Sequence, residues 1–169
     1  MMARIDRGKR ALGGAIKRST PSRAATILVE RGLVIGRALD YGCGYGLDAA
    51  MFGWDAYDPY YHPAEPAGRY DTIVCTLVLN ALSRNNRAKV LARIQALLAE
   101  DGQAYLGVAR DLPYTGKLGM HHSLQNYVVL TLPSVYADTQ LEIYLLSKTA
   151  PFADKTRDYM SRRDRRMRV

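Results

Sequence analysis

Apolar residues recur along the chain in two alternating patterns, runs at helical spacing and short continuous runs. The clearest helical pattern follows Ser83 and stops near Gly102. Its apolar positions share one face: Val90, Leu91, Ile94, Leu97 and Leu98. A second helix is predicted at 22–31, because the Ser-Thr-Pro-Ser sequence at its start supplies capping residues and an early proline. A brief third helix is predicted at 47–52, ended by Gly53.

Short apolar runs predict strands between and after these helices. The predicted strands are 37–41, 54–57, 70–77, 103–109, 127–132 and 141–147. The last two are expected to form an antiparallel pair. Because strands and helices alternate along most of the chain, the pattern predicts an α/β fold with a mostly parallel sheet and helices on both faces.

Length and composition favour a single globular domain. The chain has 169 residues, of which 48% are hydrophobic and 24% charged, and these are globular proportions. No run of about 18 apolar residues predicts a membrane span, and the N-terminus lacks the apolar centre of a secretory signal. The two cysteines, Cys43 and Cys75, are too few for a disulfide scaffold. We therefore expect a reducing, cytoplasmic setting.

Positive charge is concentrated at the two ends of the chain. The net charge is +8, with +6 in residues 1–23, +4 in residues 154–169 and −2 between them. This distribution predicts a basic N-terminal segment (1–20), a domain (21–150) and a basic C-terminal tail (151–169). Such ends bind polyanions through counterion release, which indicates nucleic acid as a partner. The alternative is that they are solvated ends that only aid solubility.

The strongest chemical signal is the stretch Ala38 to Gly46, which reads ALDYGCGYG. A predicted strand carries an acid, Asp40, near its end, and three glycines then alternate with other residues before a helix begins. Glycine tolerates a positive φ and lets a ligand approach the backbone, and a helix N-terminus offers N–H groups to an anionic group. The acid is expected at the carboxyl edge of the sheet, where α/β folds bind ligands.

This stretch resembles the first motif of the class I S-adenosyl-L-methionine (SAM)-dependent methyltransferases, D-x-G-x-G-x-G. Two further matches follow in the family's order: Asp58 ends the second predicted strand, and Tyr70 to Thr76 is similar to the family's fourth strand. The resemblance implies that the glycines hold the methionine end of SAM and that Asp58 accepts hydrogen bonds from the ribose hydroxyls. The implied cofactor-binding residues are Asp40, Gly42, Cys43, Gly44, Gly46, Asp58, Pro59, Tyr60, Thr76 and Leu77.

The chain departs from the family between the second and fourth strands. Only 11 residues separate Asp58 from Tyr70, too few for the helix, third strand and helix that the family places there. We therefore expect a Rossmann-like class I methyltransferase fold, shortened by loss of the third strand and its flanking helices. Adenine would then be held by Tyr60, Tyr61 or the proline-rich loop, since aromatic faces stack on bases. The alternative is that these tyrosines only cover the sheet edge.

Other nucleotide-binding loops match less well. Gly44-x-Gly46-x-x-Ala49 also fits the dinucleotide fingerprint, but the preceding acid is typical of methyltransferases and no second catalytic domain is present. A phosphate-loop NTPase is excluded because no Gly-Lys-Ser/Thr occurs. A narrower resemblance rests on IDRGK, DYGCGYG and WDAYDPYYHP. These motifs look like those of the methyltransferase group associated with DNA phosphorothioation systems.

The residues that would handle the acceptor are less clearly marked. Asn80 follows the fourth-strand match without the Pro-Pro-Tyr of DNA amino-methyltransferases, and no Pro-Cys nucleophile is present. The candidate catalytic residues are Asn80, Asp111 and His121. Asp111 and His121 follow the next strand and are candidate bases together with His122, since imidazole titrates near neutrality. The alternative for all three is ordinary loop packing. No metal site is predicted, because adjacent histidines project differently and lack further ligands nearby.

Three functions fit these observations. The first is a SAM-dependent methyltransferase that transfers a methyl group to a nucleic-acid or nucleotide-linked acceptor, guided by the basic ends. The second is a methyltransferase for a small molecule or protein. The third is a SAM-binding, non-catalytic partner subunit. Salt-dependent binding to nucleic acid separates the first from the second, and turnover of SAM separates both from the third.

Overall fold

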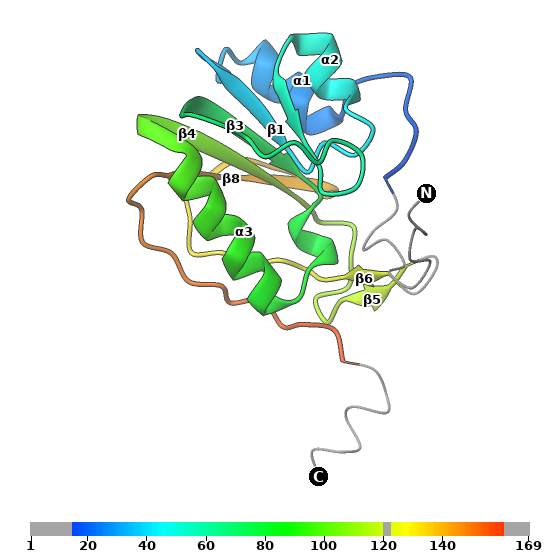
Figure 1. Cartoon of the computed structure of the whole chain (residues 1–169). Coiled ribbons are helices and arrows are strands. Elements are labelled where there is room, and N and C mark those ends of the chain that lie inside the picture. The colour runs from blue at the N-terminus through cyan, green and yellow to red at the C-terminus, as the bar shows by residue number, and fades with distance from the viewer. Residues whose placement is uncertain (1–14, 120–122, 161–169) are drawn as a thin grey trace, which may run out of the picture.

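The structure is a computed structural model that describes residues 15–119 and 123–160, and it is organised around a six-stranded sheet (Figure 1). The strand order is β2-β1-β3-β4-β8-β7, in which β2, β1, β3 and β4 run parallel, β8 is antiparallel to β4, and β7 is antiparallel to β8. The strands are β1 (Ala38–Tyr41), β2 (Asp55–Tyr57), β3 (Tyr70–Thr76), β4 (Leu98–Ala109), β7 (Ser134–Ala137) and β8 (Leu141–Ser147). The predicted mostly parallel α/β fold is confirmed.

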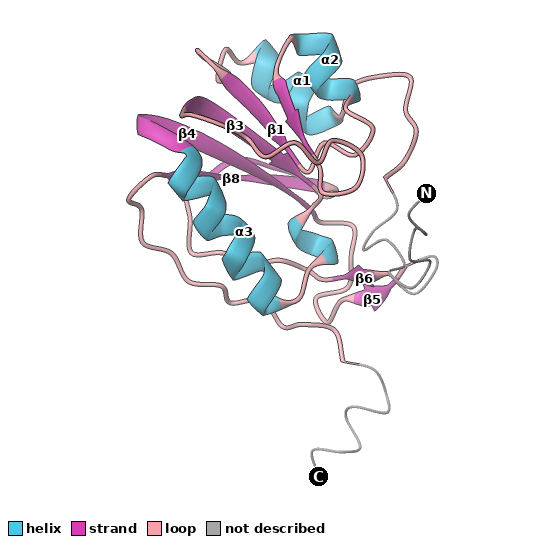
Figure 2. Cartoon of the chain, viewed as in Figure 1, coloured by secondary structure: helices cyan, strands magenta, loops and turns pink. Residues whose placement is uncertain are grey.

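Helices cover both faces of this sheet, as Figure 2 shows. The helical elements are α1 (Arg23–Glu30), α2 (Leu47–Phe52), the short 3-10 helix η1 (Leu79–Ala81) and α3 (Arg84–Leu97). One core cluster joins Leu28 of α1 to Val74 and Ile143 of the sheet, and the other joins Leu91 and Ile94 of α3 to its opposite face. None of the described helices is long and apolar enough to cross a membrane.

The chain passes from β2 to β3 without the third strand. Residues 58–69 form a loop that is pinned near its start by mutual backbone hydrogen bonds between Asp58 and His62, both 3.0 Å long. β2 is consequently an edge strand of the sheet. The expected loss of the third strand and its flanking helices is therefore confirmed, and the short interval before Tyr70 is its cause.

The prediction of a sheet strand at 127–132 is wrong. The antiparallel partner of β8 is β7, which begins after Pro133. The earlier residues instead lie on the α3 face, where Val128, Leu130 and Leu132 enter the core. Alternating apolar residues satisfy a period of two whether a segment pairs within a sheet or packs across its face, so the pattern did not distinguish the two. A small hairpin that was not predicted, β5 (Lys117–Leu118) with β6 (Leu124–Gln125), precedes this segment.

Residues 150–159 pack beside that segment and are part of the folded domain. Lys155 N–H donates to the Val129 carbonyl at 2.8 Å, and Thr131 N–H donates to the Ala153 carbonyl at 3.0 Å. The fully buried Arg87 of α3 anchors the same stretch through Asp154 at 2.7 Å and Asp158 at 2.5 Å. The structure thus differs from the sequence-based division, in which a tail begins at residue 151. Asp154 and Asp158, two acids within that basic stretch, pair with a side chain buried in the core.

One edge of the sheet gathers the loops that carry the predicted site residues. The strands β1, β2, β3 and β4 run in the same direction, so their carboxyl ends lie at one edge of the sheet and their amino ends at the other (Figure 1). The loops that follow these four strands therefore meet at the carboxyl edge, which is where ligands bind in folds of this kind.

Candidate active site

The glycine loop has a backbone that only glycine adopts readily. Gly42 and Gly46 have φ values of 82° and 79°, in the left-handed region that other residues rarely occupy. A Cβ atom on Gly42 would lie 2.3 Å from Val78 Cγ2, and one on Gly46 would lie 2.7 Å from His62 Nε2. The motif thus brings the segments that follow β2 and β3 into direct contact with the loop after β1.

Asp40 is a buried carboxylate at the end of β1 that receives no hydrogen bond from the described residues. Burial, together with the nearby carboxylates of Asp48 and Asp58, raises its pKa to about 7 against the opposing charge of Arg18. A cation placed beside such a group would favour its charged form. The residue thus fits the positively charged methionine end of SAM, as the motif implied.

Asp58 ties the β2 loop to the glycine loop. Its Oδ1 accepts backbone hydrogen bonds from Tyr60 at 2.9 Å and Tyr61 at 3.1 Å, and its Oδ2 accepts one from Gly44 at 3.1 Å. A carboxylate has about four acceptor positions, so Asp58 keeps capacity for about one ribose hydroxyl. The implied cofactor role is compatible with this geometry, but the residue also holds the loop that contains it.

Asp48 is a site residue that the sequence analysis missed. It is buried in α2, where its carboxylate accepts two hydrogen bonds from Arg18 at 3.0 and 3.2 Å and one from Ser22 N–H at 2.7 Å. Although burial raises the pKa of Asp48, these hydrogen bonds hold it below the ordinary value. They join the helix after the glycine loop to the start of α1. A lone acid within the apolar sequence LDAAMF was the available signal.

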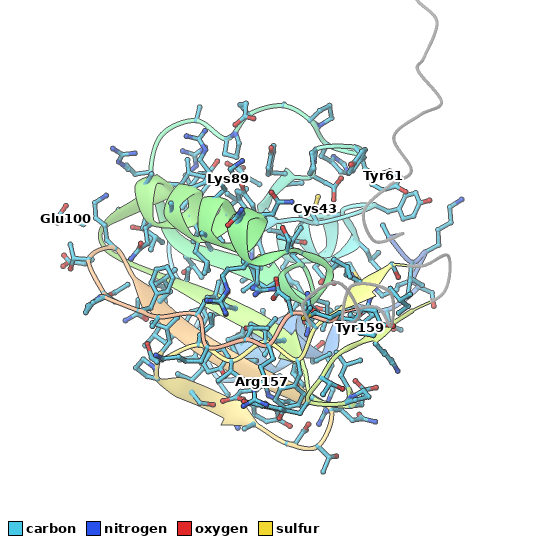
Figure 3. All side chains as sticks on the ribbon, turned by 90° about the horizontal axis from the view of Figure 1, so that it is seen from below. Cys43, Tyr61, Lys89, Glu100, Arg157 and Tyr159 are labelled. Carbon is cyan, nitrogen blue, oxygen red and sulfur yellow. The ribbon has the colours of Figure 1, made fainter. Side chains whose placement is uncertain are left out.

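Exposed tyrosines line the same edge of the sheet. The rings of Tyr45 and Tyr61 lie 4.4 Å apart, and Lys17 Nζ lies 5.6 Å from the Tyr45 ring. Tyr60 is exposed beside them, next to the exposed Pro59. Figure 3 shows Tyr61 at the end of the molecule opposite Glu100, which lies near the start of β4. Of these aromatic residues, only Tyr45 was not predicted as a site residue.

A second aromatic group follows β4. The Tyr114 and Tyr127 rings lie 5.5 Å apart, the Arg157 guanidinium lies 5.4 Å from the Tyr114 ring, and Arg110 lies 4.4 Å from the Tyr127 ring. Tyr114 is 51% exposed. Each ring of this second pair thus has a cation near it, whereas in the first pair Lys17 lies near the Tyr45 ring.

The three predicted catalytic residues are placed differently. Asn80 is buried, and its amide donates to the Asn126 carbonyl at 2.7 Å while its Oδ1 accepts from Ala109 N–H at 3.0 Å. Both polar groups are therefore engaged in tying η1 to the end of β4. Asp111 is exposed in the following loop. His121 and His122 lie outside the described residues.

The end of β3 carries two unusual features. The Thr76 hydroxyl is a buried side-chain polar atom that has no hydrogen-bond partner in the described part of the chain. Leu77 has a φ of 59°, although it is not glycine, and such strain is common at functional sites. Both residues border a cavity of about 140 Å³ whose other walls are residues 22–24 and 140–141.

The two cysteines are poor nucleophiles. Cys43 lies buried in the glycine loop, where burial raises the pKa of its thiol to about 12. Burial also raises the pKa of Cys75, which is wholly enclosed within β3. Because a thiolate is the reactive form, neither residue is prepared to attack an acceptor.

Comparisons with known proteins agree with this geometry. Residues 8–142 match the family model described as a methyltransferase domain. A Burkholderia thailandensis 1,6-didemethyltoxoflavin-N1-methyltransferase is similar in structure, with a TM-score of 0.50, 19% identity, and coverage of 72% of this chain and 75% of that one. A TehB-like SAM-dependent methyltransferase from Corynebacterium glutamicum has a TM-score of 0.50 and 16% identity over 78% of this chain and 90% of that one. No curated protein matches the sequence.

The family match spans most of the chain, and the two structural likenesses show the same Rossmann-like arrangement of the sheet. The glycine loop, the buried Asp40 and Asp58 lie at the carboxyl edge of the sheet, where folds of this kind bind their ligands. The chain therefore belongs to the methyltransferase domain family and is a SAM-dependent methyltransferase of the class I fold.

Proposed function

We propose that this enzyme methylates a nucleic-acid or nucleotide-linked acceptor. The observation that carries the proposal is the pair of tyrosine groups at the carboxyl edge of the sheet, each of which has cations near its rings. Lys17 lies near Tyr45 in the first group, and Arg157 and Arg110 lie near Tyr114 and Tyr127 in the second. Exposed aromatic rings that alternate with basic side chains stack bases while the cations meet phosphates. The arrangement is sequence-tolerant, since every base has a flat face.

The charge distribution supports the same class of acceptor. The strongly basic stretches 1–14 and 161–169 lie outside the described residues, but Lys17 and Arg157 stand next to them in the sequence. The positive charge of those stretches adds to the attraction of the protein for a polyanion. Binding would then weaken steeply with salt, because counterion release contributes less as the salt concentration rises.

The chemistry needs little from the protein beyond placement. SAM supplies a methyl group that is already activated by its positive sulfonium. Asp40, the glycine loop and Asp58 would hold that cofactor, and the loops after β3 and β4 would bring the acceptor into line with it, which is where most of the rate gain arises. A general base is required only if the acceptor must lose a proton, and Asp111 and His121 remain the predicted candidates.

A second candidate function is methylation of a small heterocyclic molecule. The open cavity beside Thr76 favours it, and the Burkholderia enzyme is described with bound 1,6-didemethyltoxoflavin. The narrower likeness to phosphorothioation-associated methyltransferases also remains a prediction, and its IDRGK motif lies outside the described residues. A cytoplasmic location and any partner subunit are likewise predictions.

The test uses methyl-labelled SAM with separate pools of DNA, RNA, protein and metabolites. We expect label in a nucleic-acid pool and salt-dependent retention on that nucleic acid. Arg157→Ala should flatten the log–log salt dependence by roughly 0.9 for each duplex phosphate that the variant no longer neutralises. Arg69→Ala is the matched control, because it removes one exposed cation just before β3, at the amino edge of the sheet. Label confined to protein or metabolites would refute the proposal.

A further inference from the structure

A cavity opens between the start of α1, the end of β3 and the start of β8. It has a volume of about 140 Å³ and is bordered by residues 22–24, Thr76, Leu77 and 140–141. Its apolar wall includes Ala24, Leu77 and Leu141, so it suits a flat apolar body better than a charged group.

The cavity adjoins the cofactor site on two sides. Val78, directly after Leu77, is the residue that crowds Gly42 of the glycine loop. Ser22, at the other wall, donates its backbone N–H to Asp48 of α2 at 2.7 Å. The walls of the cavity are therefore tied both to the glycine loop and to the helix that follows it. A group that enters the cavity comes to the edge of the sheet where the methyl group is supplied.

Two features of the cavity wall indicate a ligand. The buried Thr76 hydroxyl lacks a hydrogen-bond partner among the described residues, and such a group costs about 1–3 kcal/mol while it remains unpaired. Leu77 adopts a left-handed backbone conformation and leaves 53% of its surface exposed. A polar edge of a bound molecule would supply the partner that Thr76 lacks, and strain at Leu77 is the kind that binding sites retain.

The size of the cavity limits what it can hold. A dry cavity of about 150 Å³ accommodates a single benzene ring, whereas a fused two-ring purine is substantially larger. We propose that this cavity receives a pyrimidine-type ring of the acceptor, with a polar edge of the ring hydrogen-bonded to Thr76. The inference rests on the proposed nucleic-acid or nucleotide function and narrows it to one class of base.

The methyl group would then go to a nitrogen or oxygen on the ring. The acceptor heteroatom forms a bond to the methyl carbon, the sulfur–carbon bond breaks with its electron pair staying on sulfur, and the proton of the acceptor leaves to water. Transfer to a ring carbon would need a nucleophilic thiolate, and burial keeps both Cys43 and Cys75 protonated.

The test measures binding of cytidine monophosphate and adenosine monophosphate to the full chain in saturating S-adenosylhomocysteine. We expect cytidine monophosphate to bind at least about tenfold more tightly. Gln140→Trp should fill the mouth of the cavity and remove that binding, because Gln140 is exposed there and its backbone bonds to Arg110 and Asp138 do not need its side chain. The side chain itself makes one long hydrogen bond, in which its Oε1 accepts from Arg23 at 3.4 Å. Thr139→Trp, in the same turn but away from the cavity, is the matched control.

Thr76→Val tests the hydrogen bond and should weaken cytidine monophosphate by about tenfold in saturating S-adenosylhomocysteine. Thr26→Val is the control: it removes a hydroxyl from α1 that bonds only to the Ser22 carbonyl at the start of its own helix, and it should leave binding of cytidine monophosphate unchanged. Equal binding of the two nucleotides, or undiminished binding to Gln140→Trp, would overturn the inference. Methylation of purines alone would overturn it and leave the proposed function standing. Failure to label any nucleic acid, despite binding in the cavity, would refute the proposed function itself.

Discussion

Two buried charges, Asp40 and Arg87, show how differently one small domain treats ionised groups. Arg87 is fully enclosed, and its guanidinium donates to Asp154, Asp158 and the Leu82 carbonyl. Asp40 is almost as buried, but no described residue donates a hydrogen bond to it. A charge whose partners come from the chain itself holds the fold together. A buried charge left without such partners is costly, and under the proposed function the positive charge of bound SAM would offset that cost at Asp40.

The sharpest test of the Arg87 half of this comparison is Arg87→Ala. Removing one partner of a buried ion pair leaves the others uncompensated, which typically costs about 3–5 kcal/mol in the free energy of unfolding. Urea denaturation at neutral pH would measure the loss. Arg93→Ala is the control: its ion pair with Glu65 is 3.0 Å long but exposed, so its loss should cost less than about 1 kcal/mol. Similar losses for the two variants would show that Arg87 is not the anchor.

The next largest effect concerns Asp58, whose carboxylate has about one acceptor position left for a ribose hydroxyl. Asp58→Ala should weaken S-adenosylhomocysteine binding by roughly 1.5–3 kcal/mol, the scale of a hydrogen bond to a charged group, and calorimetry would measure it. Asp55→Ala is the matched control on β2, because its carboxylate bonds Arg37 and Tyr70 rather than the glycine loop. An unchanged dissociation constant for Asp58→Ala would mean that its three backbone bonds are its whole role.

The raised pKa of Asp40 predicts an unusual dependence of the free energy of unfolding on pH. Its pKa in the folded chain is about 7, above the ordinary 3.8. Its contribution to stability is therefore fully present below the ordinary pKa and is lost as pH rises from there through about 7. Between pH 5 and pH 8 the parent protein should lose about 1–3 kcal/mol more than Asp40→Asn, since one pKa unit corresponds to about 1.4 kcal/mol. Parallel pH profiles of unfolding for the two proteins would contradict this.

The smallest predicted effect concerns how the adenine of the cofactor is held. If Tyr61 stacks on adenine, Tyr61→Ala should weaken S-adenosylhomocysteine by about 0.5–1.5 kcal/mol, the range for an aromatic stacking pair. The same loss should appear with methylthioadenosine, which carries the adenine but lacks the amino-acid end. Titration of both ligands would measure it. Equal affinity of parent and variant for methylthioadenosine would leave Tyr61 as a cover for the sheet edge.

Local signals made much of the fold predictable. The glycines between Asp40 and Gly46 predict the backbone conformation of the loop. They are required there by positive φ values and by the closeness of Val78 and His62. The missing third strand followed from chain length alone. The family assignment, too, needed only residues that lie close together in sequence.

Long-range pairing could not be predicted in the same way. Asp154 and Asp158 stand in a basic stretch that has the composition of a tail, and their partner Arg87 lies about seventy positions earlier. The engaged amide of Asn80 depends on Ala109 and Asn126 in the same manner. In each case the pairing depends on the path of the chain in space, and composition and periodicity do not predict that path.

The Arg87 anchor has a consequence for how the chain folds during synthesis. The strands β1 to β4 and helix α3 leave the ribosome long before Asp154 and Asp158, at synthesis rates of about 5–20 residues per second. Until then the guanidinium of Arg87 keeps its water, and the α3 side of the core lacks the covering provided by residues 128–132 and 150–159. The nascent chain therefore waits several seconds with an open apolar face. Closure of the domain becomes a late, cooperative event, and that interval is when the chain most needs a chaperone.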